Sequence, residues 1–256
     1  MEKDKEVLLF QKRIRELAER AESTGCPQFT DFLNLYEQNI LHDTLQNFPW
    51  INWKTFGGYE QAERQMAAFL PDALSYDGSE VEYPIACLHI RPKNSRFAET
   101  LTHRDILGAL MNLGIDRCKT GDIPVLDQEA YLFCHGSLGE MICQELTRIR
   151  RTSVVCTVCR ETGFTYTPRT KSVTGSISSL RLDALLSVAF QSSRSSLLSL
   201  IQEGKVFVNG KLITSNAFIP KEGDLVSVRG MGRFRYLGTG GQTKKGRMVI
   251  QAERFI

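Results

Sequence analysis

The residues best suited to chemistry in this chain are basic side chains in its last third, which recur where short segments join. Arginine presents a planar fork and lysine a compact charge, and both bind phosphate groups well. A helix that starts beside such a side chain adds N–H donors and the positive end of its dipole. The spacing therefore predicts a surface that binds a polyanion. Its basic members are Arg181, Arg194, Lys205, Lys211, Arg229, Arg233 and Arg235.

The segments between these residues have the patterns of two helices followed by short strands. Ser193 can cap the second helix, and Gly204 suits its C-terminal end. Asn209-Gly210 between two apolar runs is a strong hairpin signal. The expected elements are helices over residues 182–189 and 194–203 and strands over residues 206–208, 211–213 and 225–229.

Charge is unevenly distributed along the chain, although its formal net charge is only +3. Residues 168–256 contain 14 Lys+Arg and 5 Asp+Glu, a net charge of +9. The remaining 18 basic and 24 acidic residues leave residues 1–167 at −6. A basic end on an acidic body is typical of a protein whose end faces a polyanion such as RNA.

We expect an α+β protein made of several parts. These are a helical N-terminal region at 1–75, a ferredoxin-like βαββαβ domain at 83–160, a linker at 161–179 that ends in a short extended stretch, and a small RNA-binding domain with a basic tail at 180–256.

The helical prediction for residues 1–75 depends on three apolar stripes. They lie within residues 7–21, 31–47 and 59–69, and Pro71 ends the third. Trp50 and Trp53 fall between the second and third stripes. We expect both tryptophans to clamp the helices together, with base stacking as the alternative.

Residues 83–160 alternate between strand and helix patterns in the order of the split βαβ fold. We expect strands over residues 84–90, 117–126, 130–134 and 152–159 and helices over residues 102–113 and 138–150. The first helix has clear ends, because Thr102 and Asp105 have the spacing of a capping box and Gly114 suits the C-terminus. His103 and Arg104 then lie in the first turn and face solvent. They are candidates for phosphate contact, with ordinary solvation as the alternative. The topology alone is weak evidence for RNA binding.

No segment has the pattern of a catalytic, metal or cofactor site. Cys156 and Cys159 form a lone CxxC pair without the second pair that a tetrahedral zinc site needs. His135-Gly136-Ser137 lacks the strand–turn context of a serine nucleophile, and no glycine-rich nucleotide loop is present. We therefore expect no catalytic residue, no metal and no cofactor.

The seven cysteines are scattered and odd in number, and most lie in apolar runs, as expected for free thiols in a reducing compartment. The first residues do not have the pattern of a signal peptide. No apolar run approaches the ~20 residues of a membrane span. We expect a soluble, cytoplasmic protein with no membrane partner.

From about Leu180 to Leu237 the sequence resembles the S-four domain, a module named after a ribosomal protein. The similar segments are Arg181-Leu182-Asp183, Ser193-Arg194-Ser195, Leu200-Ile201, Gly204-Lys205-Val206, Val208-Asn209-Gly210 and Gly223-Asp224. In that family the starts of two helices and the following hairpin form a basic face that binds structured RNA. The resemblance assigns this role to Arg181, Ser193, Arg194, Ser195, Lys205, Asn209 and Lys211. Ordinary solvation is the alternative for each, and a positive φ is the alternative for Asn209.

Across nearly the whole chain the sequence resembles the YlmH proteins. The similar segments are Gly57-Gly58-Tyr59 with Glu63-Arg64, residues 101–115, Gly121-Asp122-Ile123, and Arg229-Gly230 with Gly232-Arg233-Phe234. These proteins combine a helical N-terminus, a ferredoxin-like RNA-binding domain and a C-terminal S-four domain. The resemblance implies a non-enzymatic factor, monomeric off the ribosome. It would contact ribosomal RNA and tRNA on the large ribosomal subunit during rescue of stalled translation.

Two other functions fit part of the sequence. The first is an RNA-modifying enzyme, because some S-four proteins are pseudouridine synthases whose catalytic aspartate follows an Arg-Leu pair. Here Arg181-Leu182-Asp183 is instead part of the first predicted helix of the module, and no catalytic domain follows it. The second is an adaptor that binds proteins through its N-terminal region and is linked to cell division, since the family is associated with cell-division gene clusters.

Overall fold

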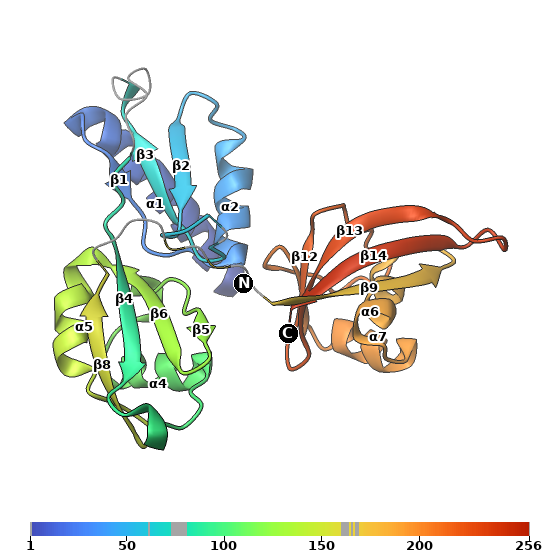
Figure 1. Ribbon diagram of the computed structural model, residues 1–256. Coiled ribbons are helices and arrows are strands. Elements are labelled where there is room, and N and C mark those ends of the chain that lie inside the picture. Colours follow the sequence, from blue (N-terminus) through green and yellow to red (C-terminus); the bar gives the residue numbers. More distant parts are fainter. Residues whose placement is uncertain are drawn as a thin grey trace. The chain divides into compact units, whose positions relative to one another are not determined.

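The chain forms two compact units in the computed structural model, which describes residues 2–60, 62–72, 81–159, 164, 166 and 169–255. The first unit comprises Met1–Asn34 and Ile40–Tyr166, and the second comprises Leu35–Asn39 and Thr167–Ile256. Both units combine helices with sheets (Figure 1). The expected α+β class is therefore confirmed.

The N-terminal half of the first unit is a small sheet packed against helices. Its elements are α1 (Glu2–Thr24), β1 (Gln28–Phe29), α2 (Leu35–Leu45, of which Ile40–Leu45 belong to this unit), β2 (Asn52–Phe56) and β3 (Met66–Leu70). The antiparallel strands are ordered β1-β3-β2, so β3 is central. Ile14 and Ala21 on one stripe of α1 join a core with Leu41 of α2 and Phe69 of β3. Sheet and helices thus bury each other's apolar faces.

The third helix expected in this region does not form. Residues Met66–Leu70 are the central strand β3, and every one of them is buried. A short apolar run that is buried on both faces cannot be distinguished from a helix core by periodicity alone. Trp53 lies in β2 with its ring centroid 4.8 Å from that of His42 in α2. Trp50 is 68% exposed, so the expected clamp by both tryptophans is wrong for Trp50.

The second half of the first unit has the predicted βαββαβ order. Its main elements are β4 (Ile85–Pro92), α4 (His103–Asn112), β5 (Val125–Leu126), β6 (Glu129–His135), α5 (Gly139–Glu145) and β8 (Thr152–Val158). β4 pairs antiparallel with both β6 and β8, and β5 pairs with β6. This interleaving of two βαβ units is the ferredoxin-like arrangement, so that prediction is confirmed.

Two elements of this domain are shorter than predicted. The strand expected over residues 117–126 is a 3-10 turn, η2 (Arg117–Lys119), followed later by β5 alone. The helix expected over residues 138–150 ends at Glu145. The chain then enters β7 (Arg148–Ile149), which forms a hairpin with β8. The remaining short turns are η1 (Ser95–Phe97) and η3 (Gly136–Leu138).

Helix α4 begins and ends as its local sequence predicts. The Thr102 hydroxyl accepts a hydrogen bond from the Asp105 N–H at 3.3 Å, and the Asp105 carboxylate accepts one from the Thr102 N–H at 2.9 Å. Gly114 follows the helix with a φ of +77°, a conformation that favours glycine. Ile106 of α4 and Ile142 of α5 then pack into one core with β4 and β6.

The second unit is a sheet with helices on one face. Its elements are β9 (Thr170–Ile177), α6 (Leu182–Phe190), α7 (Arg194–Gln202), β10 (Val206–Val208), β11 (Lys211–Leu212), β12 (Leu225–Val228), β13 (Gly232–Gln242) and β14 (Met248–Phe255). The strand order is β11-β10-β12-β13-β14-β9. Leu185 and Leu186 of α6 and Leu197 of α7 pack with Val226 and Phe234 of the sheet.

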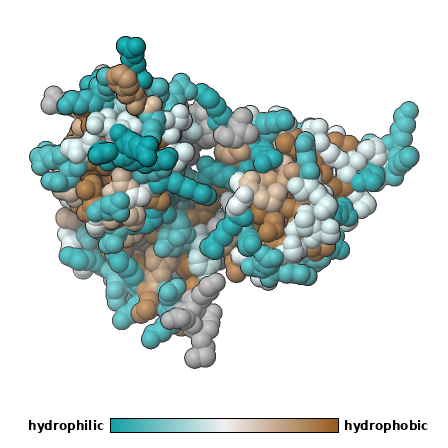
Figure 2. Space-filling view, turned by 90° about the horizontal axis from the view of Figure 1, so that it is seen from below, coloured by the Kyte–Doolittle hydropathy of each residue, from teal (hydrophilic) through white to brown (hydrophobic). Residues whose placement is uncertain are grey.

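Part of the expected linker, Thr170–Ile177, and the expected basic tail are structured, while residues 161–163, 165, 167 and 168 of the linker lie outside the described residues. β9, which lies within the expected linker, pairs with β14 along its whole length from Thr170 to Ile177. β13 and β14 replace the expected tail and form a long hairpin whose turn projects from the unit and is hydrophilic (Figure 2). Its register shifts next to Gly238 and Gly241, which have positive φ, as at β-bulges.

Candidate nucleic-acid interface

The start of α7 presents three of the expected RNA contacts to solvent. Ser193 caps the helix, because its Oγ accepts a hydrogen bond from the Ser196 N–H at 3.4 Å. Arg194 follows in the first turn, is exposed, and forms no ion pair with any residue in the described part of the chain. Ser195 is exposed beside it. A helix start next to a solvent-facing guanidinium is well suited to a phosphate group.

Arg181 precedes α6 and is held by an acidic residue of that helix. Its Nε donates a hydrogen bond to Oδ1 of Asp183 at 3.0 Å. The Asp183 side chain is only 8% exposed, against 42% for Arg181. The carboxylate therefore fixes the guanidinium, but it also offsets part of the positive charge at this helix start. The Arg181 guanidinium is thus held in one orientation, and its positive charge is partly neutralised.

The hairpin after α7 uses one expected RNA contact for folding. Asn209 has a φ of +48°, and its Nδ2 donates to Oδ1 of Asp224 at 2.8 Å. The Asn209 Oδ1 accepts the Leu225 N–H at 2.9 Å. Its side-chain amide therefore joins the hairpin to β12. Lys205 pairs with Glu203 at 2.6 Å, while Lys211 is exposed.

The remaining expected arginines of this unit lie on the other face of the sheet from α6 and α7. Phe234 of β13 is buried in the core on the helix side, and side chains alternate along a strand. Arg233 and Arg235 therefore point away from the helices. The Arg229 guanidinium is on this same side, 5.0 Å from the ring centroid of Phe207.

The structure thus separates seven of the expected RNA-binding residues into two groups on opposite sides of the sheet. The helix-side group is Arg181, Ser193, Arg194 and Ser195, and the open-face group is Arg229, Arg233 and Arg235.

His103 and Arg104 begin α4 in the first unit and are exposed, as predicted. The capping box already places the Asp105 carboxylate at this helix start, which makes it less attractive to a phosphate. Although the His103 side chain reaches solvent, nearby protein atoms partly desolvate its ring, which lowers the pKa of His103, and the charge of Arg117 lowers this pKa further. The lowered pKa favours the neutral imidazole, so Arg104 is the charged candidate in this turn.

Polar residues that carry the YlmH resemblance meet in the first unit at a joint between its two sheets. The Asp122 carboxylate accepts the Tyr59 hydroxyl at 2.8 Å and the N–H groups of Glu63 and Arg64 at 2.7 and 3.1 Å. Burial raises the pKa of Asp122, while the Tyr59 hydrogen bond, the Arg64 N–H and the charges of the nearby arginines oppose the rise. These motifs therefore hold the two halves of the unit together.

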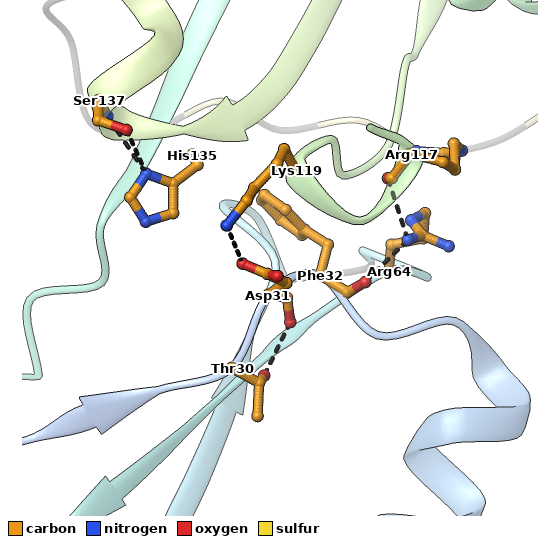
Figure 3. Close-up of polar contacts among 8 residues, drawn as sticks. All are labelled: Thr30, Asp31, Phe32, Arg64, Arg117, Lys119, His135 and Ser137. Atoms are coloured by element: carbon orange, nitrogen blue, oxygen red, sulfur yellow. Dashed lines mark hydrogen bonds and ion pairs between the residues drawn. The ribbon is translucent and has the colours of Figure 1, made fainter. Parts of the chain in front are cut away.

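The side chain of Arg64 completes the joint (Figure 3). Its guanidinium donates to the carbonyl oxygens of Thr120, Phe32 and Arg117 at 3.0, 2.8 and 3.3 Å. Lys119 forms an ion pair with Asp31 at 2.6 Å across the same joint. The sequence contained a signal for this joint, because Arg64 and Asp122 both lie in segments that are similar to the YlmH proteins. It did not indicate that the two residues are in contact.

The sheet face opposite α4 and α5 is only partly accessible. In RNA-recognition motifs the corresponding face stacks bases on aromatic side chains. Here Phe133 of β6 is buried, with ring centroids 5.0 Å from Tyr59 and 5.4 Å from Phe164. Tyr131 stacks on His89 at 4.8 Å on the same side. Tyr131 and Phe133 thus share one face, as their alternation predicts, but Phe133 is covered.

Side chains that suggest catalysis have structural neighbours instead. Burial raises the pKa of the Cys156 thiol, which lies 3.2 Å from the Cys143 sulfur, and a protonated thiol is unreactive. The Ser137 hydroxyl lies 2.8 Å from Nδ1 of His135, which caps η3 (Figure 3). Over the residues that the structure describes, no cluster of three acidic, histidine or cysteine side chains is placed to hold a metal ion. None of the described helices is long and apolar enough to cross a membrane.

Three family models match successive parts of the chain. The model described as "YlmH, N-terminal" matches residues 6–73, and "Putative RNA-binding domain in YlmH" matches residues 79–162. The model "S4 domain", which is the S-four domain, matches residues 180–226. That last match contains α6, α7 and the hairpin, whereas β9, β13 and β14 lie outside it.

The chain is also similar to two individual proteins. It is 29% identical over 231 residues to the "Ribosome-associated protein quality control protein P2" of Bacillus subtilis (strain 168), a match that covers 89% of this chain and 87% of the relative. Among solved structures it resembles the "Cell division protein ylmH from Streptococcus pneumoniae", with 23% identity and a TM-score of 0.48. That match covers 60% of this chain and 91% of the solved one.

Proposed function

The chain belongs to the YlmH family, and from this membership we propose that it is a non-enzymatic factor that binds structured RNA on the large ribosomal subunit. Its role is the rescue of stalled translation, with ribosomal RNA and peptidyl-tRNA as the RNA partners. The name of the Bacillus subtilis relative, a ribosome-associated quality-control protein, supports the ribosomal part of this proposal.

The observation that carries the proposal is the helix-side group within the matched S-four domain. Arg194 is exposed and without an ion-pair partner among the described residues, at a helix start that Ser193 caps. Arg181 begins the neighbouring helix α6, with its guanidinium held by Asp183. Two helix starts with two arginines offer N–H donors, positive dipole ends and charge to adjacent phosphates.

This arrangement favours recognition of RNA by its backbone. Contacts to phosphates fix the position of a protein on RNA but carry little sequence information. Double-stranded RNA in particular is recognised mostly by shape and by its backbone and 2′-hydroxyl groups. The protein is therefore expected to bind a folded region of ribosomal RNA or tRNA through its geometry, with an affinity that falls as salt rises.

The test is co-sedimentation of the full chain with large ribosomal subunits in sucrose gradients. We expect the wild type to co-sediment and Arg194→Ala to dissociate at a lower salt concentration. Arg13→Ala is a matched control, because Arg13 is an exposed arginine of α1 in the acidic first unit. An Arg13 variant that dissociates as readily as the Arg194 variant would contradict the assignment of the docking face.

Two further measurements separate the alternative functions. Nucleoside analysis of ribosomal RNA from cells lacking the protein should show every base modification intact, and loss of one would support an RNA-modifying enzyme. Co-sedimentation should be lost after RNase digestion of the subunits. Partner binding that survives RNase would support a protein adaptor.

A further inference from the structure

Side chains line up across the open face of the second unit's sheet. Phe207 of β10 is directly opposite Ser227 of β12, and Ser227 is directly opposite Arg233 of β13. Phe255 of β14 is directly opposite Thr170 of β9. The Arg233 guanidinium lies 4.7 Å from the ring centroid of Phe255. One row of side chains therefore crosses the sheet in the order Phe207, Ser227, Arg233, Phe255 and Thr170. Directly opposed residues of antiparallel strands point to the same side.

Two arginine–phenylalanine pairs occupy this row. Arg229 lies over Phe207 at 5.0 Å, and Arg233 lies over Phe255 at 4.7 Å. The two rings are three strand spacings apart, or roughly 14 Å. A guanidinium over a ring is a flat cationic surface, on which a nucleic-acid base stacks well.

Core packing does not account for these two phenylalanines. The core lies on the helix side, where Val206 and Val208 flank Phe207 in β10 and are buried. Phe207 and Phe255 are partly exposed and outside that core. In the next row Arg235 is exposed and faces Glu253 across the strands, so the charged side chains named on this face are three arginines and one glutamate. Such a face is complementary to a flexible polyanion with aromatic bases.

We propose that this open face binds an unpaired segment of RNA. Bases stack on the Arg229–Phe207 and Arg233–Phe255 pairs, and Arg235 contacts the backbone. The inference rests on the proposed function, because it assumes that the protein binds RNA. It adds a second surface to the helix-side group, on the opposite side of the sheet, with unpaired RNA as its ligand class.

The test compares two RNA probes with the full-length protein by fluorescence anisotropy: a labelled oligouridylate and a labelled blunt RNA duplex. The variant Arg229→Lys/Arg233→Lys keeps both charges but removes both planar guanidinium groups. We expect its affinity for oligouridylate to fall about tenfold, the scale of one lost stacking contact. The salt dependence should stay unchanged because the number of cations is the same. Duplex affinity should also stay unchanged.

A matched control is Arg247→Lys, the same exchange at an arginine whose guanidinium contacts the Ser176 carbonyl instead of a ring. It should bind both probes as the wild type does. Phe255→Leu keeps an apolar strand residue and should weaken oligouridylate binding too, with an unchanged melting temperature as the folding check. Ultraviolet cross-links of oligouridylate should map to Phe207 or Phe255.

The outcomes distinguish this inference from the proposed function. Duplex binding that depends on Arg194, together with an Arg229→Lys/Arg233→Lys variant that binds oligouridylate normally, overturns the open-face site alone. Equal loss of oligouridylate affinity in Arg247→Lys also overturns it, because stacking would then not be the cause. A wild-type protein that binds neither probe contradicts both the inference and the proposed function.

Discussion

The two arginines at the helix starts of the second unit differ in what their guanidinium groups contact. Arg194 is exposed and has no ion-pair partner among the residues with described positions. Replacing it with alanine should weaken RNA binding and flatten the log–log salt dependence by somewhat less than one unit, since each phosphate on a duplex contributes roughly 0.9. The melting temperature should not change. An unchanged salt dependence would remove Arg194 from the docking face.

Arg181 should behave differently, because its side chain also stabilises the fold. Arg181→Ala leaves the nearly buried Asp183 carboxylate without the Nε donor that contacts it at 3.0 Å. We expect a loss of about 1 kcal/mol in the free energy of unfolding, a value reduced by the exposure of the arginine. Thermal melting measures this loss. Equal melting temperatures for Arg181→Ala and Arg194→Ala would show that the Asp183 contact contributes nothing.

At the joint of the first unit, Asp122 accepts three hydrogen bonds from groups distant in sequence. In Asp122→Asn the side chain keeps its shape, but the amide NH2 group replaces a carboxylate oxygen. It therefore faces a donor whose hydrogen bond the carboxylate had accepted. The unfolding free energy should fall by about 1–3 kcal/mol, the cost of an unsatisfied buried group. Urea unfolding monitored by tryptophan fluorescence reports on this unit. Asp116→Asn, at an exposed aspartate with no cap hydrogen bond, is the control and should be neutral.

Whether a residue could be placed from the sequence depends on how local its contacts are. The Thr102–Asp105 capping box and the Ser193 cap involve neighbours three residues apart, and both were predictable. The pairing of Asn209 with Asp224 and that of Arg64 with Thr120 bring together residues far apart in the chain. No periodicity records such contacts. The positive φ expected as the alternative for Asn209 is confirmed, but its contact with Asp224 and the role of Arg64 became visible only in the fold.

At the scale of the elements, the strand β9 sets the boundary at which the sheet of the second unit begins. It pairs with β14 from Thr170 to Ile177 and buries Val173 and Ile177, although its sequence resembles a linker. A fragment of residues 180–256 should therefore be less stable than one of residues 169–256. The loss should be at least ~2 kcal/mol, since forfeiting one buried isoleucine costs about that much. Circular dichroism melting of the two fragments measures the difference, and equal melting temperatures would make β9 dispensable.

Elements with strong local signals were predicted, and those that depend on distant pairing were not. The Asn209-Gly210 hairpin and α4 have turn and cap residues in the right places. The strand β3 is buried on both faces and was mistaken for a helix. The glycine-rich β13 resembles a loop, because its glycines occupy bulges that form only when β14 pairs with it. The division of the arginines between two faces follows from the alternation of side chains along the strands and from the packing of α6 and α7 against one face of the sheet.

At the scale of the whole molecule, charge and structure divide the chain at the same place. The segment with a net charge of +9, residues 168–256, lies in the second unit, and all but residues 35–39 and Thr167 of the acidic remainder at −6 lies in the first. Both groups of arginines, on the helix side and on the open face, belong to the basic unit. In the first unit, Arg64 is used in the joint and Phe133 is covered by Tyr59. The second unit should therefore provide most of the RNA affinity.

A gel-shift measurement at matched salt tests this claim most directly, with a labelled fragment of large-subunit ribosomal RNA as the probe. The proteins compared are the full chain, residues 169–256 and residues 1–166. We expect the fragment 169–256 to bind within about tenfold of the full chain, a difference of ~1.4 kcal/mol. Residues 1–166 should bind far more weakly. Full affinity in residues 1–166, with little or none in residues 169–256, would contradict the account.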